Sequence, residues 1–309
     1  MRVAVVDIGS NSTRLLVAEL EDGRVTAELA RRTTVTRLGD GVDASGNLGE
    51  EAMERVHRTL EEYRAVIDSQ SVDAALAVLT SAVRDAGNGE QFAGTVETRY
   101  KLTPHILTGD QEAALTFLGA TSERSPEDRT PTVVIDIGGG STEFVIGTGR
   151  QPSFNVSNQA GVVRQTERHI DHDPPKQSEL EAIAEDVRAI FERGVPEQQR
   201  RAVRHAIAVA GTATSLAAIA QELDPYDPEK VHGYVIGVAE CERILNRLAS
   251  MPLDQRREVP GLHPDRAPTI VAGAVILIEA LRFFGLDEVE ISEHDILRGA
   301  ALGLTGSGS

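Results

Sequence analysis

The sequence predicts an α/β fold built from two domains of the same plan, and three observations lead to this prediction. The chain has 309 residues, of which 40% are hydrophobic and 26% charged. This is enough for two globular domains, because single cores rarely grow beyond roughly 250–300 residues. Strand-like apolar runs alternate with segments of helical periodicity. A segment close to the N-terminus is also repeated in the second half of the chain.

The repeat is the most informative feature. Residues 5–17, VVDIGSNSTRLLV, recur as residues 134–146, VIDIGGGSTEFVI. In both copies an apolar run ends in Asp, passes through a Gly/Ser-rich turn and enters a second apolar run, which is typical of a β-hairpin with a polar tip. A third strand-like stretch follows each copy, at residues 24–38 and 150–157. Both halves are therefore expected to begin with the same three strands.

The remaining elements follow from apolar spacing. The rest of the first half is expected to form a helix over 50–68, a strand over 73–80, a turn-rich segment over 81–88, a strand over 104–107 and a helix over 109–119. The second half is expected to form helices over 177–191, 212–223, 237–249, 266–284 and 295–304, with strands over 203–210 and 288–291.

A polar, proline-bearing segment at 121–131 marks the expected boundary between the halves. Domains are therefore predicted at 1–125 and 126–305, and residues 306–309 are predicted to be a flexible tail.

Composition excludes several classes of function. The formal net charge is −17, which disfavours binding to nucleic acid or to anionic membranes, because both need an extended basic surface. Since only three basic residues are lysines, an anion clamp would be made of arginines. The single Cys241 allows no internal disulfide, so a cytoplasmic location is expected. No secretory signal is expected, and the apolar run 269–286 is expected to be a buried helix.

The two hairpin tips indicate phosphate chemistry. A strand that ends in Asp and turns through Gly and Ser aims several backbone N–H groups into one concavity that can bind an anion, and glycine permits close approach and positive φ angles. The Asp faces the same space and can bind Mg²⁺. Two such tips facing each other across a cleft would bind a chain of phosphates; otherwise they are only tight turns. The residues proposed for this binding are Gly9, Ser10, Asn11, Ser12, Gly138, Gly139, Gly140 and Ser141.

Six motifs, in this order along the chain, resemble those of the exopolyphosphatase/guanosine pentaphosphate phosphohydrolase family. They are DIGSNSTRLL, TSAVRDAGN, LTGDQEAAL, IDIGGGSTEFVIG, AGTATSLAAIA and RAPTIVAGA. The resemblance covers nearly the whole chain and is to the short, two-domain form, so contacts that long forms make through extra domains are not expected. It implies two ribonuclease-H-like domains of the actin/hexokinase/Hsp70 superfamily with an interdomain cleft.

The resemblance also implies roles for residues of the first half. Glu112 occupies the place of the family's catalytic glutamate and is expected to act as general base; without the resemblance it would be an acid in the first turn of a helix. The family usually carries an acidic residue at the place of Gln111. Arg14 and Arg84 are expected to contact phosphate, and the alternative for Arg84 is a surface pair with Asp85 or Glu90.

In the second half, Asp136 is the first choice for Mg²⁺, with Mn²⁺ as the alternative ion, and Glu143 is the expected second ligand. Asp7 is the counterpart of Asp136 in the first domain. The start of the helix at Gly211 and Thr212 can bind an anion through N–H groups. A further anion contact is expected from Arg266.

The resulting hypothesis is Mg²⁺-dependent release of terminal orthophosphate from inorganic polyphosphate by direct attack of water. One alternative is hydrolysis of guanosine pentaphosphate at its 5′ γ-phosphate, and another is a noncatalytic sensor of polyphosphate or guanosine tetraphosphate. A more distant alternative is an ATP-dependent sugar or acyl kinase, which would lack a glutamate in the 109–113 segment. A homodimer through exposed apolar helices of the second half is also expected.

Two His-Asp pairs suggest another kind of metal site. His172-Asp173 and His294-Asp295 are similar to the pair of metal phosphohydrolases, but the further His and Asp residues that such sites need are not at compatible places. We therefore expect a solvated loop and a helix start. His232 lies in a loop that resembles a family motif and is given no role.

Overall fold

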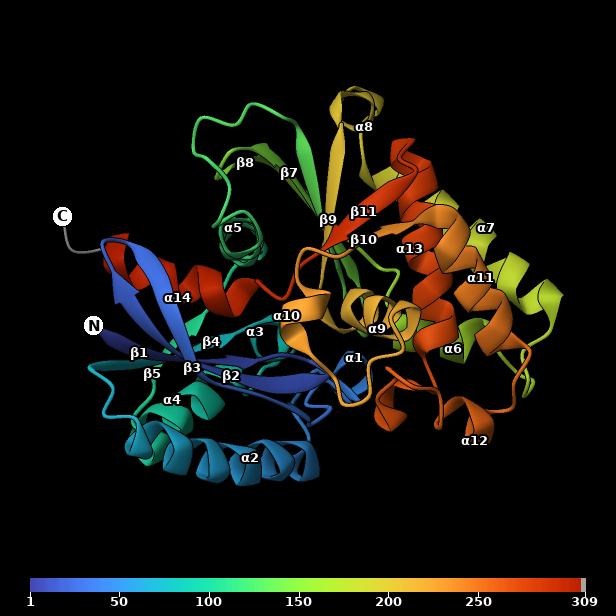
Figure 1. Ribbon diagram of the computed structural model, residues 1–309. Coiled ribbons are helices and arrows are strands. Elements are labelled where there is room, and N and C mark those ends of the chain that lie inside the picture. Colours follow the sequence, from blue (N-terminus) through green and yellow to red (C-terminus); the bar gives the residue numbers. More distant parts are fainter. Residues whose placement is uncertain (307–309) are drawn as a thin grey trace. The chain divides into compact units, whose positions relative to one another are not determined.

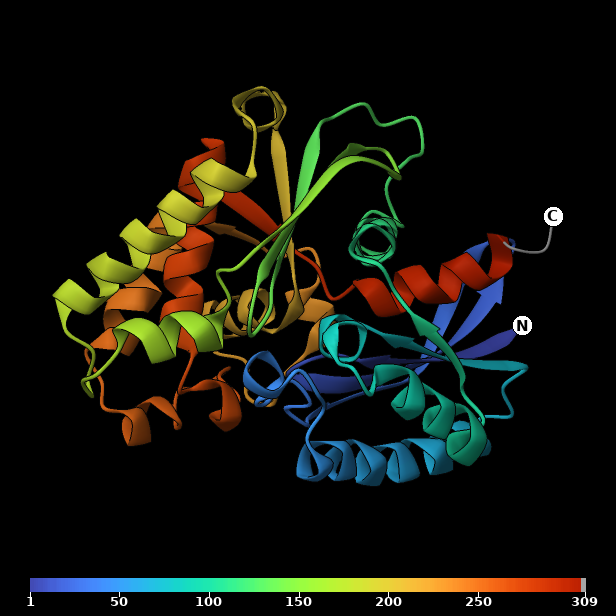
Figure 2. The ribbon, with the colours of Figure 1, turned by 180° about the vertical axis from the view of Figure 1, so that it is seen from behind.

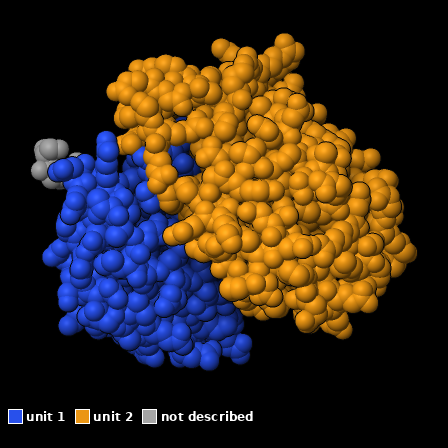
Figure 3. Space-filling view, in the orientation of Figure 1, with its two compact units in different colours: residues 1–122, 295–309 blue, residues 123–294 orange. Residues whose placement is uncertain are grey.

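The computed structural model contains two compact units. It describes residues 1–306, with the side chains of all of them except Asp43 and residues 304–306. Unit 1 comprises Met1–Ser122 and Asp295–Ser309, and unit 2 comprises Glu123–His294 (Figure 3).

Unit 1 is built on a five-stranded sheet in the order β3-β2-β1-β4-β5 (Figure 1). β1 (Arg2–Ile8), β2 (Ser12–Glu21) and β3 (Arg24–Val35) are antiparallel neighbours, whereas β4 (Ala74–Leu79) and β5 (Thr103–Ile106) extend the sheet in parallel with β1. The central strand β1 is almost wholly apolar because helices cover both of its faces.

Side chains of β1 alternate between two cores. Ala4, Val6 and Ile8 pack with α2 (Glu50–Ser69) and α4 (Gly89–Tyr100), which lie side by side on one face (Figures 1 and 2). Val3 and Val5 pack on the other face, against the C-terminal helix α14 (Ile296–Gly306). That helix also packs along α5 (Gly109–Ala120). Two short helices, α1 (Val42–Ser45) and α3 (Ser81–Asp85), complete the unit.

Unit 2 repeats this plan in a six-stranded sheet with the order β10-β11-β9-β6-β7-β8. The strands are β6 (Thr132–Ile137), β7 (Thr142–Thr148), β8 (Gln151–Asn158), β9 (His205–Val209), β10 (Val235–Gly237) and β11 (Glu288–Ile291). β6, β7 and β8 form the antiparallel part, and β9 is parallel to β6. The repeated sequence therefore forms equivalent hairpins in equivalent sheets.

The core of unit 2 is centred on the apolar helix α13 (Ile270–Phe284), whose residues are nearly all buried. Phe144 of β7 contacts Phe191 and Phe284 at ring-centroid distances of 4.7 and 5.1 Å. The other helices are α6 (Val162–His169), α7 (Gln177–Gly194), α8 (Glu197–Ala202), α9 (Ala210–Ala220), α10 (Pro228–Val231), α11 (Val238–Ala249), α12 (Leu253–Arg256) and the 3₁₀ turn η1 (Pro264–Arg266). As expected, the run 269–286 forms a buried helix, and no helix among the described residues is long and apolar enough to cross a membrane.

The predicted elements are largely present, but the helices α1, α6, α8, α10 and α12 and the strand β10 were not predicted. Two further differences concern predicted segments. The turn-rich segment 81–88 contains α3, and α4, which was not predicted, follows it directly. The helix expected over 266–284 begins only at Ile270, because residues 264–266 form a 3₁₀ turn with Pro264 at its start.

The boundary predicted at residue 305 is also corrected, because α14 belongs to unit 1. Glycines allow this helix to approach α5 closely: a Cβ on Gly119 would lie 1.9 Å from the carbonyl oxygen of Asp295, and one on Gly299 would lie 1.9 Å from that of Leu115. The predicted tail 306–309 lies outside the described residues except for Gly306, which ends α14.

Candidate active site

Three parallel strands of unit 1 end at the same edge of its sheet and carry the predicted site residues of the first half. The loop 9–12 follows β1, α3 with Arg84 follows β4, and Glu112 stands in the first turn of α5, which follows β5. Ligands bind at the carboxyl ends of parallel strands in open α/β sheets. The sheet order therefore gathers residues that are more than a hundred positions apart in the sequence.

The loop 9–12 is held by its carbonyl groups. Gly39 N–H donates to the carbonyl of Ser10 at 2.8 Å, and the N–H groups of Thr36 and Arg37 donate to the carbonyl of Asn11 at 3.0 and 2.9 Å. In a trans peptide the following N–H points the opposite way, so the N–H groups of Asn11 and Ser12 point away from these donors. This is the arrangement expected of an anion nest. Hydroxyl groups of Ser10 and Ser81 lie 2.8 Å apart and link the loop to α3.

Arg14 and Asp7 are opposite each other on β2 and β1 and form a buried ion pair. Arg14 donates to Asp7 Oδ2 from Nε at 2.9 Å and from Nη2 at 2.5 Å, and Nη1 donates to Asp295 Oδ2. Asp7 is 4% exposed. Burial raises its pKa, the charge of Arg14 opposes this shift, and the charge of Asp295 adds to it. Oδ1 of Asp7 has no hydrogen-bond partner among the described residues.

Asp295 is the partner of Arg14 that the sequence did not identify. The expected helix start is correct, since Asp295 Oδ1 accepts a hydrogen bond from Leu297 N–H at 3.0 Å just before α14. His294 and Asp295 are buried, at 8% and 4% exposed. Asp295 is buried because its carboxylate shares the Arg14 guanidinium with Asp7. Only the His-Asp pair at a helix start could have drawn attention to it.

Arg84 and Glu112 lie in direct contact. Arg84 Nη1 donates to Glu112 Oε2 and to the carbonyl of Leu107, both at 3.1 Å, while its Nε contacts Asp85 Oδ1 at 3.3 Å. The alternative pairing of Arg84 with Asp85 therefore exists together with the contact to Glu112. Glu112 is one quarter exposed (25%), so its carboxylate can meet both water and a ligand.

Gln111 has a structural role beside Glu112. Its side chain accepts a hydrogen bond from Thr108 N–H at 3.0 Å, and its own N–H donates to Thr108 Oγ1 at 3.2 Å. This capping box fixes the first turn of α5. Gln111 and Leu107 also line a shallow pocket of about 350 Å³.

The second loop, 138–141, repeats the geometry of the first. Gly138 N–H donates to the carbonyl of Ser141 at 2.9 Å, as Gly9 N–H does to that of Ser12 at 3.0 Å. The carbonyls of Gly138 and Gly139 accept hydrogen bonds from the first N–H groups of α6, and that of Gly140 accepts one from Gly161 N–H. The N–H groups of residues 139–141 therefore point away from α6.

The reason given for the loop glycines needs a correction. None of these glycines has a positive φ angle, so the expectation of such angles was wrong, and the close approach of an anion to their backbone stays a prediction. A Cβ on Gly9 would lie 3.2 Å from the carbonyl oxygen of Ser12, and one on Gly138 would lie 3.3 Å from that of Ser141. The sequence missed Gly161, where a Cβ would lie 2.3 Å from the carbonyl oxygen of Gly139.

Asp136 and Glu143 occupy, in unit 2, the register position that Asp7 and Arg14 occupy in unit 1. Glu143 Oε1 accepts hydrogen bonds from Ser141 Oγ at 2.6 Å and from Ser157 Oγ at 2.8 Å. Two carboxylates directly opposite on antiparallel strands repel each other, and carboxylate oxygens are the ligands that Mg²⁺ prefers. This donor set therefore fits a hard divalent cation. In unit 1 the guanidinium of Arg14 supplies the positive charge instead.

Gly211 and Arg266 are brought together within unit 2. A Cβ on Gly211 would lie 1.2 Å from Arg266 Nη1, so the guanidinium lies directly against the backbone at the start of α9. The buried Arg256 donates to the carbonyls of Leu248, Met251 and Ala267, which fixes the segment that carries Arg266. The side chain of Thr212 is buried against α13, so an anion at this place could use its N–H but not its hydroxyl.

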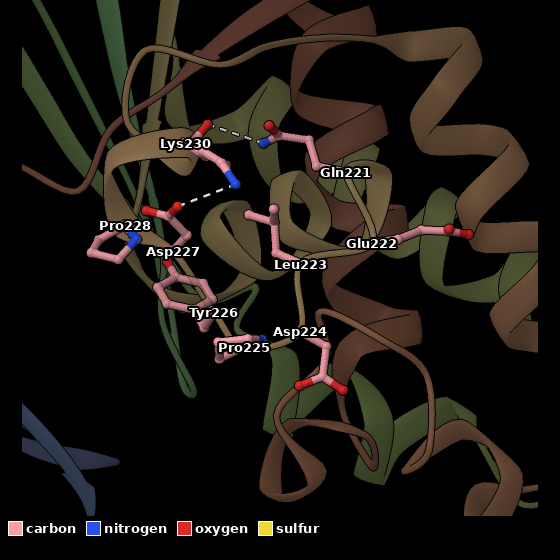
Figure 4. Close-up of a pocket in the computed structure, with 9 residues that line it drawn as sticks. All are labelled: Gln221, Glu222, Leu223, Asp224, Pro225, Tyr226, Asp227, Pro228 and Lys230. Carbon is pink, nitrogen blue, oxygen red and sulfur yellow. Dashed lines mark hydrogen bonds and ion pairs between the residues drawn. The ribbon is translucent and has the colours of Figure 1, made fainter.

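A separate pocket of about 470 Å³ contains none of the predicted site residues (Figure 4). The segment between α9 and α10 lines it and carries Glu222, Asp224 and Asp227, and Lys230 pairs with Asp227 at 3.4 Å. Its excess of carboxylates makes it unsuitable for a phosphate chain.

Comparison with known proteins identifies the family of this chain. The model of the Ppx/GppA phosphatase family matches residues 16–305. Exopolyphosphatase 2 of Mycobacterium tuberculosis is 36% identical over 317 residues, which cover 99% of this chain and 99% of that protein. The crystal structure of the Aquifex aeolicus member of the Ppx/GppA family is 31% identical, with a TM-score of 0.85, and the match covers 100% of this chain and 99% of that one.

A structure of an exopolyphosphatase from Cytophaga hutchinsonii shares the fold at 24% identity, with a TM-score of 0.87 and coverage of 100% and 99% of the two chains. Together with the two mixed sheets, these similarities confirm the predicted α/β fold class of two domains of related plan. They also confirm that the protein is a phosphatase. The chain belongs to the Ppx/GppA phosphatase family.

Proposed function

We propose that this protein releases orthophosphate from the end of inorganic polyphosphate by direct attack of water. The observation that carries this proposal is the contact between Arg84 and Glu112 at 3.1 Å, beside a loop whose N–H groups are arranged for an anion. A guanidinium binds a terminal phosphate with two parallel hydrogen bonds. The adjacent carboxylate is then within reach of a water molecule that attacks the same phosphorus.

In the proposed reaction Glu112 accepts a proton from water as the oxygen of that water bonds to the terminal phosphorus. The bond between this phosphorus and the bridging oxygen breaks, and the shortened chain leaves with the bonding electrons on that oxygen. Arg84 holds both the carboxylate and the phosphate. General base catalysis of this kind contributes typically about 10²–10⁴-fold to the rate.

The other predicted residues would bind the rest of the phosphate chain. We assign this role to the N–H groups of the loops 9–12 and 138–141, to Arg14, and to Gly211, Thr212 and Arg266. Asp136 and Glu143 would hold Mg²⁺, or Mn²⁺ in its place, and Asp7, the counterpart of Asp136 in unit 1, is the third carboxylate proposed for metal binding. When bound, the ion offsets phosphate charge and polarises the terminal oxygens.

Polyphosphate is proposed before guanosine pentaphosphate because the similar Mycobacterium tuberculosis protein is named an exopolyphosphatase. Both compounds present a terminal phosphoanhydride, so the geometry of Glu112 and Arg84 suits either of them. The glutamate at position 112 argues against a sugar or acyl kinase. It argues equally against a noncatalytic sensor, because a sensor has no use for a general base.

The test is phosphate release from polyphosphate, guanosine pentaphosphate and ATP, measured in parallel with Mg²⁺ and with EDTA. We expect the highest kcat/KM with polyphosphate and loss of activity in EDTA. A higher kcat/KM with guanosine pentaphosphate would show that this compound, and not polyphosphate, is the preferred substrate of the same hydrolytic reaction. Binding of polyphosphate without release of phosphate would contradict the proposed function.

A further inference from the structure

A cluster of one carboxylate and two imidazoles is formed by residues that have no part in the proposed phosphate hydrolysis. Glu123, His232 and His294 each offer one ligand atom, and these atoms lie within 4.8 Å of one another. His232 Nε2 lies 3.3 Å from Glu123 Oε2, and His294 Nδ1 lies 3.8 Å from Glu123 Oε1. All three residues belong to unit 2.

We propose that this cluster binds a divalent transition-metal ion of the Zn²⁺ class. In a tetrahedral site with metal–ligand bonds of about 2.0–2.1 Å, ligand atoms are about 3.3 Å apart. His232 Nε2 already lies at this distance from Glu123 Oε2, whereas His294 Nδ1 lies 3.8 Å from the other oxygen, Oε1. Because the three ligand atoms lie within 4.8 Å of one another, a movement of the exposed Glu123 side chain that brings one oxygen towards both rings completes the geometry. Three protein ligands leave a fourth position for water.

The two imidazoles are already held next to each other. Their ring centroids are 3.9 Å apart. The backbone of His294 is fixed by Ser292, whose Oγ accepts a hydrogen bond from His294 N–H at 2.9 Å. His232 N–H donates to the carbonyl of Pro228 at 2.9 Å, and Gly233 N–H donates to that of Ile291 at 2.8 Å. Because the ligands are ordered beforehand, little conformational entropy is lost when the ion binds.

Metal binding by His232 would also break a hydrogen bond with the neighbouring backbone. If His232 binds through Nε2, its proton resides on Nδ1, which here accepts a long hydrogen bond of 3.3 Å from Glu293 N–H. Metal binding therefore releases the Glu293 amide from this contact. The resonance of the Glu293 amide therefore reports whether the metal ion is bound.

The chemistry of the ligands separates this site from the one proposed for Mg²⁺. Imidazole suits Zn²⁺, Cu²⁺, Fe²⁺ and Ni²⁺, whereas Mg²⁺ prefers oxygen ligands such as those of Asp136 and Glu143. Glu123 and His294 are also the first and last residues of unit 2. One ion would therefore tie together both ends of this unit and stabilise it against unfolding.

The experiment is a titration of the metal-free protein with Co²⁺ in excess Mg²⁺, followed by the visible absorption of tetrahedral Co²⁺ and by thermal unfolding. We expect one Co²⁺ per chain, displacement by Zn²⁺, a higher melting temperature and a shifted Glu293 amide resonance. His232→Asn and Glu123→Ala should each weaken Co²⁺ binding by about tenfold or more, because each variant lacks one of the three ligands. These two ligands are chosen because they are less buried than His294.

The matched control is His172→Asn, which also removes an imidazole in contact with a carboxylate, that of Glu179 at 2.7 Å. This variant should bind Co²⁺ as the native protein does. The proposal would be overturned by Co²⁺ affinity that is unchanged in His232→Asn, by loss of Co²⁺ binding in excess Mg²⁺, or by absence of Co²⁺ binding to the native chain. Because His232 and Glu123 contribute little to the core, these variants are expected to fold.

Discussion

Residue by residue, the two repeated hairpins carry different charges at equivalent places. Asp7 faces Arg14 in unit 1, and Asp136 faces Glu143 in unit 2. In the first pair the guanidinium of Arg14 balances the charge of Asp7. The second pair consists of two carboxylates, so a cation from solution would be needed to balance their charge. The two copies of one motif are therefore suited to different tasks, and the proposed metal site of unit 2 differs from the ion pair of unit 1 by a single exchange of Arg for Glu.

Removing Arg14 should destabilise unit 1 strongly. Arg14→Ala leaves Asp7 and Asp295 buried without their shared guanidinium, which we expect to lower the free energy of unfolding by about 3–5 kcal/mol near neutral pH. Urea unfolding measures this change. The control Arg257→Ala breaks an exposed pair with Asp254 and should cost about 1 kcal/mol or less. Equal losses in the two variants would contradict the assignment of a buried pair.

The sign of the pH dependence follows from Asp7. Its pKa in the folded state is raised from the ordinary value of 3.8, so the native protein binds this proton more tightly than the unfolded chain does. The contribution of Asp7 to stability is therefore present below 3.8 and falls as the pH rises through the raised pKa. Loss of Arg14 removes the charge that opposes this shift, so the fall should be larger in Arg14→Ala.

Glu143 offers the most direct control of metal binding at the proposed Mg²⁺ site. Glu143→Gln removes one of two opposed carboxylates, and we expect the Mg²⁺ concentration for half-maximal phosphate release to rise by about tenfold or more. Paramagnetic resonance of bound Mn²⁺ gives a second measurement that needs no turnover. Ser157→Ala, which removes one hydrogen bond to Glu143, should have a smaller effect. Unchanged metal dependence in Glu143→Gln would exclude it as a ligand.

Among the elements, α6 has a specific task, because its first turn holds the carbonyl groups of the loop 138–141. Gly161 permits this contact. In Gly161→Ala the new methyl group must displace the loop, so we expect KM for polyphosphate to rise while the folded structure persists. Gly94→Ala is the control, since a Cβ there meets nothing within 4 Å and should stabilise α4 by about 0.5–1 kcal/mol. An unchanged KM in Gly161→Ala would show that the contact between α6 and the loop 138–141 does not affect substrate binding.

The sequence allowed the individual helices and strands to be predicted, but not the contacts between residues that are distant in the chain. Both hairpins are encoded within short segments by apolar runs and polar tips, so their strands and even the pairing of Asp136 with Glu143 follow from the pattern. Gly161 and Asp295 act on residues far away in the chain, and no local pattern specifies such contacts. The cluster of Glu123, His232 and His294 was missed for the same reason.

For the whole molecule, the C-terminal helix is the main departure from the predicted domains. α14 returns to unit 1 and packs along α5, which carries Glu112. The small residues Gly119 and Gly299 make this approach possible, but small residues in a helix do not reveal their partner in the sequence. The predicted homodimer stays a prediction. Among the described residues the large apolar side chains that are exposed are those of Met1, Tyr226 and Val235.

The net charge of −17 bears on the length of the substrate. A long polyanion is repelled wherever it extends past the arginines that bind its end, so we expect short polyphosphates to be hydrolysed at least as efficiently as long ones. Measuring kcat/KM against chain length tests this, and added salt should improve the rate with long chains by screening the repulsion. A steep rise of kcat/KM towards chains of hundreds of phosphates would contradict the expectation.

The most direct test of the central claim compares Glu112→Gln with the native protein in phosphate release from polyphosphate. The amide keeps the size of the side chain and cannot accept the proton, so we predict that kcat falls by about 10²–10⁴-fold while polyphosphate binding is retained. Asp110→Asn, a carboxylate-to-amide change in the same first turn of α5, should keep the native rate. Equal rates in Glu112→Gln and the native protein would contradict the assignment of Glu112 as the general base.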